Sequence, residues 1–62
     1  PNKLAVLRAA AKIEPEPAEV MHWYRTIPIV HLSRLTAEEL VAGGRADEVL
    51  GFLRAIRDDP VG

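Results

Sequence analysis

Apolar residues recur at helical spacing in four stretches of the chain, and residues that cap or break helices lie between these stretches. The first helix is predicted at Lys3–Ile13, with Asn2 as its N-cap. Two prolines in residues 14–17 cannot continue this helix and therefore end it. Its apolar face is predicted to carry Leu4, Leu7 and Ala11, with Val6 and Ala10 beside them.

The second helix is predicted from Pro17 to about Thr26, because proline suits the first position of a helix. Its lone tryptophan is interpreted as the largest side chain of the core. The apolar face of this helix carries Val20, Trp23 and Tyr24, with Met21 at the flank.

The apolar stretch around Pro28 alternates loosely, as a strand would. A single short strand without a partner is unstable, so a buried, extended connection is predicted instead. This connection is expected to lay Ile27, Val30 and Leu32 into the core.

Residues 35–44 contain the clearest local signal in the chain. Thr36 and Glu39 have the spacing of a capping box, in which each side chain bonds the backbone N–H of the other residue. A short helix is therefore predicted at Ala37–Ala42, and Gly43–Gly44 should end it because glycine accepts the left-handed conformation. The residues with the arrangement of a hydrophobic staple across this cap are Leu35 and Leu40.

The last helix is predicted from Arg45 or Ala46 to Arg57, and residues 58–62 are expected to form a short mobile tail. Its buried stripe is predicted to contain Val49, Leu50, Leu53 and Ile56, with Phe52 at the edge. The whole pattern predicts an all-α fold in a single domain of residues 1–62. That fold is a small bundle of about four short helices with an extended apolar connection around Pro28.

Composition narrows the class of protein. A chain of 62 residues buries only about 60% of the surface that its unfolded form exposes, so burial against a partner would stabilise it. The chain has no cysteine and no long apolar run or signal pattern, so a cytoplasmic location without a membrane span is expected. With 8 basic and 9 acidic residues it has no basic excess, which argues against binding of nucleic acid.

Few residues of the chain are candidates for catalysis or metal binding. Ser33 would need His22 or His31 as its base, and no glycine-flanked turn surrounds it. His22 and Glu19 would share a helix face, but two ligands do not make a metal site. No catalytic, cofactor-binding or metal-binding residue is therefore predicted, and the chain is not expected to be an enzyme.

The order of several residues from Val20 onward is more specific than any one of them. Trp23 is followed by Thr26-Ile27-Pro28 and Leu32, then by the run of residues 34–41, then by Gly44-Arg45, Val49-Leu50 and Leu53. In this order the chain resembles the C-terminal toxin-binding domain of the Xre/MbcA/ParS antitoxins. It departs from that pattern in Ile29, where the family has asparagine after the proline, in Ala37, where it has proline, and in the final residues.

The resemblance implies a cytoplasmic bacterial antitoxin whose partner is a RES-domain toxin, an enzyme that consumes NAD or uses it for ADP-ribosylation. Full-length members carry an N-terminal helix-turn-helix region, for which the first predicted helix is too short, so the chain is expected to be the toxin-binding part alone. The resemblance further implies that the C-terminal segment enters the active-site cleft of the toxin. The expected toxin-contact residues are Arg57, Asp58, Asp59, Pro60, Val61 and Gly62.

The charge of that segment also favours a role in binding, and one alternative function stays open. Asp58 and Asp59 are the only neighbouring acidic residues without a structural explanation, and they would meet the positive groups that a pyrophosphate-binding cleft needs. The alternative is a self-associating helical domain, an oligomerisation or adaptor module with no toxin partner.

Overall fold

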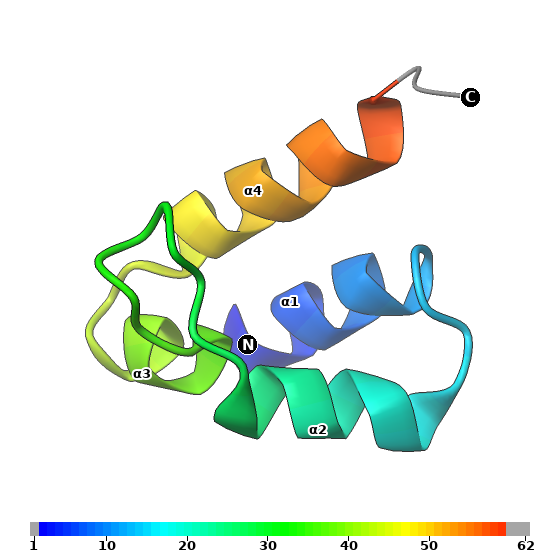
Figure 1. Ribbon diagram of the computed structural model, residues 1–62, viewed down its shortest axis with the longest axis horizontal. Coiled ribbons are helices and arrows are strands. Elements are labelled where there is room, and N and C mark those ends of the chain that lie inside the picture. The colour runs from blue at the N-terminus through cyan, green and yellow to red at the C-terminus, as the bar shows by residue number, and fades with distance from the viewer. Residues whose placement is uncertain (1, 60–62) are drawn as a thin grey trace.

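Four helices follow one another along the chain in the computed structural model, which describes residues 2–59 (Figure 1). They are α1 (Asn2–Ala11), α2 (Pro17–Thr26), α3 (Ala37–Ala42) and α4 (Ala46–Asp58). Within residues 2–59 no strand forms, and the isolated bridge there joins Ile29 to Leu35. The prediction of a small all-α bundle of about four short helices is confirmed.

Helix α1 lies in the middle of the bundle and packs against α2, α3 and α4. It forms an antiparallel pair with α2, whereas α4 runs in the same general direction as α1 on its other side (Figure 1). The short helix α3 closes one end, where it contacts α2 and α4 as well as α1. The backbones of α2 and α4 do not come into contact, so α1 alone joins the two longer flanking helices along most of their length.

The core gathers side chains from all four helices and from the connection between α2 and α3. Tyr24 is 2% exposed and is the largest fully buried side chain, so the prediction that Trp23 is the core's largest piece is wrong. Trp23 is half-buried at the side of the core. The buried residues are Val6, Ala10, Val20, Tyr24, Ile29, Ala37, Leu40, Ala46, Val49 and Leu53.

The buried face of α1 differs from the predicted one. Val6 and Ala10 point into the core, whereas Leu4 is 52% exposed, Ala11 is exposed and Leu7 is half-buried. Because three helices approach α1, its inner face needs small side chains that permit close contact, and the larger leucines are displaced to the rim. The helix boundaries agree with the prediction to within two residues at each end.

The connection around Pro28 also places different residues in the core from those predicted. Ile29 is 3% exposed, whereas Ile27 is 43% and Val30 is 67% exposed, and Leu32 is half-buried. The alternating pattern predicts the wrong buried residues here, because the chain is extended only as far as Ile29 and then turns tightly. The carbonyl of Ile29 accepts the N–H groups of Leu32 at 2.9 Å and of Arg34 at 3.1 Å, which closes this turn.

Two neighbouring residues of that turn adopt the left-handed conformation that favours glycine. Ser33 has a φ of 63° and Arg34 a φ of 59°. Such a conformation costs roughly 1–2 kcal/mol for each residue with a Cβ atom. The turn is retained because it brings Leu35 back to pair with Ile29, whose N–H donates to the Leu35 carbonyl at 2.8 Å.

Helix α3 begins and ends where the local sequence predicts. The Thr36 N–H donates to Glu39 Oε1 at 2.9 Å and the Glu39 N–H donates to Thr36 Oγ1 at 3.1 Å, so the capping box is confirmed. At the other end of α3, the N–H of Gly44 donates to the carbonyl of Val41 at 3.1 Å, and the N–H of Arg45 donates to the carbonyl of Leu40 at 2.8 Å. This pair of bonds is a Schellman motif, which requires the positive φ of 79° at Gly44.

Gly44 and Gly51 offer a matched test of this geometry, since no heavy atom outside the local backbone lies within 4 Å of a Cβ added at either position. Gly44→Ala should lower the free energy of unfolding by about 1 kcal/mol, because alanine is strained at positive φ. Gly51→Ala should raise it by about 0.8–1 kcal/mol, because Gly51 lies inside α4 and has a φ that alanine prefers. Urea unfolding followed by circular dichroism measures both, and effects of the same sign would contradict this account.

Tyr24 should make the fold sensitive to alkali. Burial raises the pKa of Tyr24 above its ordinary value of 10.0, and the negative charge of Glu38 raises this pKa further. The unfolded chain then loses the phenol proton first, so this contribution to stability is complete below about pH 10 and is lost as the pH rises towards the folded pKa.

We expect Tyr24→Phe to flatten the fall in stability that begins as the pH rises above about 10. Thermal unfolding at a series of pH values measures this, and because Tyr24 is the only tyrosine its ultraviolet absorbance reports the ionisation directly. An ordinary titration midpoint in the folded chain would contradict the assignment.

Candidate functional site

An apolar groove lies where the end of α1, the body of α2 and the second half of α4 come together. Its volume is about 340 Å³. Ala10 and Ile13 contribute from α1 and the turn that follows it, and Leu53 separates the groove from the core. The apolar groove is lined by Ala10, Ile13, Glu14, Glu19, Val20, His22, Trp23, Ile27, Phe52, Leu53 and Ile56.

The groove follows from the packing of the helices. Since α2 and α4 both pack on α1 while their backbones stay apart, a channel remains between them on one side of α1. The small side chain of Ala10 keeps the floor of this channel low. The turn at residues 12–16 then directs the chain from α1 to α2 and forms one end of the channel.

Large apolar side chains remain open to solvent in the groove. Ile13 is 38%, Ile27 43% and Ile56 45% exposed, while Trp23 and Phe52 are half-buried. A cluster of exposed apolar residues in one hollow marks an interaction site more often than the same residues scattered over a surface. The prediction that Ile27 and Ile56 belong to the core is therefore wrong, and together with Trp23 they line this groove instead.

The polar rim of the groove is acidic. Glu14 and Glu19 line it, His22 stands beside them, and no lysine or arginine is among the lining residues. Glu14 accepts the backbone N–H of Glu16 at 2.8 Å, which orders the turn before α2. Within residues 2–59 neither Glu14 nor Glu19 forms an ion pair, so both negative charges face solvent uncompensated.

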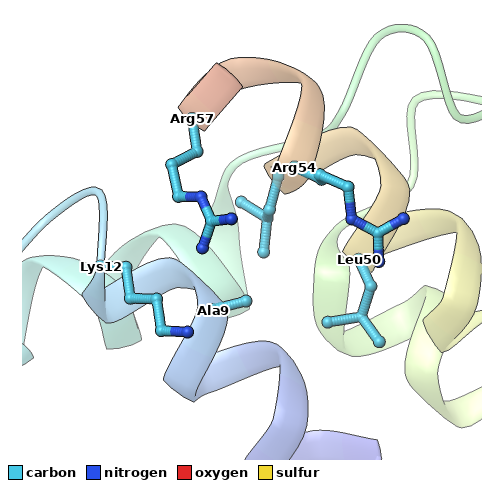
Figure 2. A pocket seen from close by; sticks show the side chains of 6 residues that line it. Ala9, Lys12, Leu50, Arg54 and Arg57 are labelled. Carbon is cyan, nitrogen blue, oxygen red and sulfur yellow. The ribbon is translucent and has the colours of Figure 1, made fainter.

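A second hollow, of about 230 Å³, lies between α1 and α4 and is basic. Lys12, Arg54 and Arg57 line it above an apolar floor of Ala9, Leu50 and Leu53. Figure 2 shows Arg57 reaching from α4 towards the side of α1 where Lys12 lies, whereas the Arg54 guanidinium turns the other way, over Leu50. Arg57 lies in the last turn of α4 and Lys12 directly follows the last residue of α1, so the helix dipoles stabilise both positive charges.

In the predicted toxin-contact segment, Arg57 and Asp58 form the end of α4. Asp58 is the final residue of α4, so the helix extends one residue beyond its predicted end at Arg57. The helix ends there because Asp59 precedes a proline and is extended, with φ −67° and ψ 118°. Arg57 Nε and Asp58 Oδ1 are 3.6 Å apart, and both side chains are more than half exposed. Pro60, Val61 and Gly62 lie outside the described residues.

The structure does not bring the two histidines and the serine together in one site. His22 on α2 contacts Thr26, whose hydroxyl donates to the His22 carbonyl and lies 3.4 Å from His22 Nε2. His31 and Ser33 lie in the turn after Ile29, and no hydrogen bond joins them. Across residues 2–59 no group of three histidine or acidic side chains is placed to hold a metal ion. None of the helices described is both long and apolar enough to span a membrane.

Comparison of the chain with protein-family models, with curated proteins and with solved structures finds no match.

Two alanine substitutions should distinguish the contribution of the groove's floor to stability from that of its rim. Leu53→Ala should lower the free energy of unfolding by about 2–5 kcal/mol, because this side chain is buried and leaves a cavity. Ile56→Ala should lower it by less than about 1 kcal/mol, because Ile56 is already half in water. Denaturant unfolding of both variants measures the difference, and equal losses would place Ile56 in the core.

Proposed function

We propose that this chain is an antitoxin-type binding module that neutralises a RES-domain toxin, an enzyme that consumes NAD or uses it for ADP-ribosylation, by covering the toxin's active site. The observation that carries a binding function is the apolar groove, which leaves Ile13, Ile27 and Ile56 open to solvent. The class of partner rests on the resemblance of residues 20–62 to the Xre/MbcA/ParS antitoxins.

The residues that carry the resemblance have two kinds of role in the fold. Thr36, Glu39 and Gly44 cap α3, and Val49 and Leu53 belong to the core, so these residues support the fold rather than the partner. Trp23 and Ile27 instead line the groove, at the surface. The resemblance is therefore compatible with both a shared scaffold and a shared binding surface.

The proposed inhibitory segment begins at the end of α4, which lies at the opposite end of this helix from α3 (Figure 1). Arg57, Asp58 and Asp59 are exposed there. A cleft that binds the pyrophosphate of NAD needs positive groups, and carboxylates form charge-assisted hydrogen bonds with such groups. The exposed contact of Asp58 with Arg57 is a weak surface ion pair, so Asp58 can exchange it for a partner's cation.

The test neutralises charge without shortening α4. We expect Asp58→Asn combined with Asp59→Asn to weaken binding of a RES-domain toxin at least tenfold and to restore its NAD consumption, because hydrogen bonds to charged groups are worth about 1.5–3 kcal/mol each. Titration calorimetry and an NAD assay measure the two effects.

Asp47→Asn is the matched control, since Asp47 is an exposed acidic residue at the other end of the same helix. This variant should bind and inhibit as the parent chain does. Full neutralisation by the doubly substituted chain would refute the role of the C-terminal segment and leave the helical surface as the inhibitory element.

Self-association is the second candidate function, because another copy would also remove the exposed isoleucines of the apolar groove from solvent. Size-exclusion chromatography with light scattering, over a range of concentrations, distinguishes a monomer that awaits a partner from a stable oligomer.

A further inference from the structure

We propose that the apolar groove receives an amphipathic helix of the partner protein, and that basic residues flank the apolar stripe of that helix. This inference rests on the proposed function as a protein-binding module. It concerns a different surface from the C-terminal segment, so the two can fail separately.

The shape of the groove suits a helix. Its two sides are α2 and α4, its floor is the end of α1, and the backbones of the two sides do not come into contact. A helix laid between α2 and α4 would cover α1 on its open side and give the bundle a further packed helix. Docking of this kind uses a few apolar anchors at helical spacing in a preformed groove.

The apolar anchors are concentrated in one place. Trp23 and Phe52 stand half-buried on α2 and α4, and the exposed Ile13, Ile27 and Ile56 line the same groove. Other exposed apolar residues, such as Leu4 and Val30, do not line the groove. Half-buried aromatic side chains at the centre of an interface contribute most to binding, and isoleucines around them exclude water.

The charges at the rim of the groove indicate which kind of partner helix binds there. Glu14 and Glu19 stand at the rim with no ion pair among the described residues, and no cation lines the groove to attract an acidic helix. A helix with lysine or arginine beside its apolar stripe would pair with both glutamates. Such complementarity steers association and rejects partners of the wrong charge.

The same charges disfavour a second copy as the occupant. Two copies that met groove to groove would bring their acidic rims together. The basic residues Lys12, Arg54 and Arg57 line the other hollow, so pairing them with a neighbour's groove would join unlike surfaces. Contacts between unlike surfaces do not close into a symmetric dimer.

The experiment uses the whole chain and two synthetic peptides without tryptophan. Both peptides form amphipathic helices of equal length, one from leucine and lysine and the other from leucine and glutamate. Trp23 is the only tryptophan and lines the groove, so its fluorescence reports binding there. We expect a saturable spectral change with the lysine peptide, and an affinity at least tenfold lower for the glutamate peptide. This preference should shrink at high salt.

Two matched pairs of variants locate the site. Ile27→Ser should weaken binding of the lysine peptide about tenfold because it removes an apolar anchor, whereas Val30→Ser, at an exposed residue of the same connection outside the groove, should not. Glu19→Gln should weaken binding a few-fold and reduce the preference for lysine. Asp47→Asn, which also removes a carboxylate from the first turn of a helix, should change neither quantity.

Three results would overturn the inference: equal affinity for the two peptides, equal losses in Ile27→Ser and Val30→Ser, or a dimer of the free chain that Ile27→Ser dissociates. Failure of the antitoxin proposal has a different signature. If the peptide binds as expected while a RES-domain toxin does not bind, the groove is supported and the identity of the partner is wrong. If Ile27→Ser still binds and inhibits the toxin while the charge-neutralised C-terminal variant does not, the antitoxin proposal is supported and the groove inference fails.

Discussion

The packing of α2, α3 and α4 around α1 is the interaction on which the rest of the structure depends. Val6 and Ala10 are the buried residues of α1, and their small size lets other helices approach its backbone closely. Every other helix contacts α1, whereas the backbones of α2 and α4 do not come into contact. A larger residue at Ala10 would separate the helices and fill the floor of the apolar groove, so stability and surface shape are coupled at this position.

The same constraint explains why apolar residues remain at the surface. A bundle of 62 residues with helices of 6 to 13 residues has too little interior to bury every apolar side chain it carries. Part of this surplus, Ile13, Ile27 and Ile56, lies together where two helices flank a third without closing over it, whereas Leu4 and Val30 are exposed elsewhere. A partner that covers this groove would bind the folded chain and not the unfolded one, and would therefore stabilise the fold by mass action.

The features that the sequence predicts well are those that depend on neighbouring residues. The capping box of Thr36 and Glu39, the glycine pair after α3 and the prolines before α2 act within four positions along the chain, so their outcome does not require knowledge of the fold. Which side of each helix faces inward depends on where the other helices lie. Trp23 and Tyr24 are adjacent in sequence, and the positions of the other helices decide that Tyr24 is buried and Trp23 lies in the groove. The groove forms only when α1, α2 and α4 pack together, so no local sequence pattern predicts it.

The two proposed contact surfaces meet at the last turn of α4. Ile56 lines the apolar groove, Arg57 lines the basic hollow on the other side of the helix, and Asp58 ends the helix beside them. A partner helix seated in the groove would therefore lie close to the point where the chain leaves α4. The groove would then orient the partner, and the acidic residues after Arg57 would reach the partner surface next to the docked helix. Because binding at one surface raises the effective concentration of the other, two weak contacts arranged in this way give a tight complex without either being strong alone.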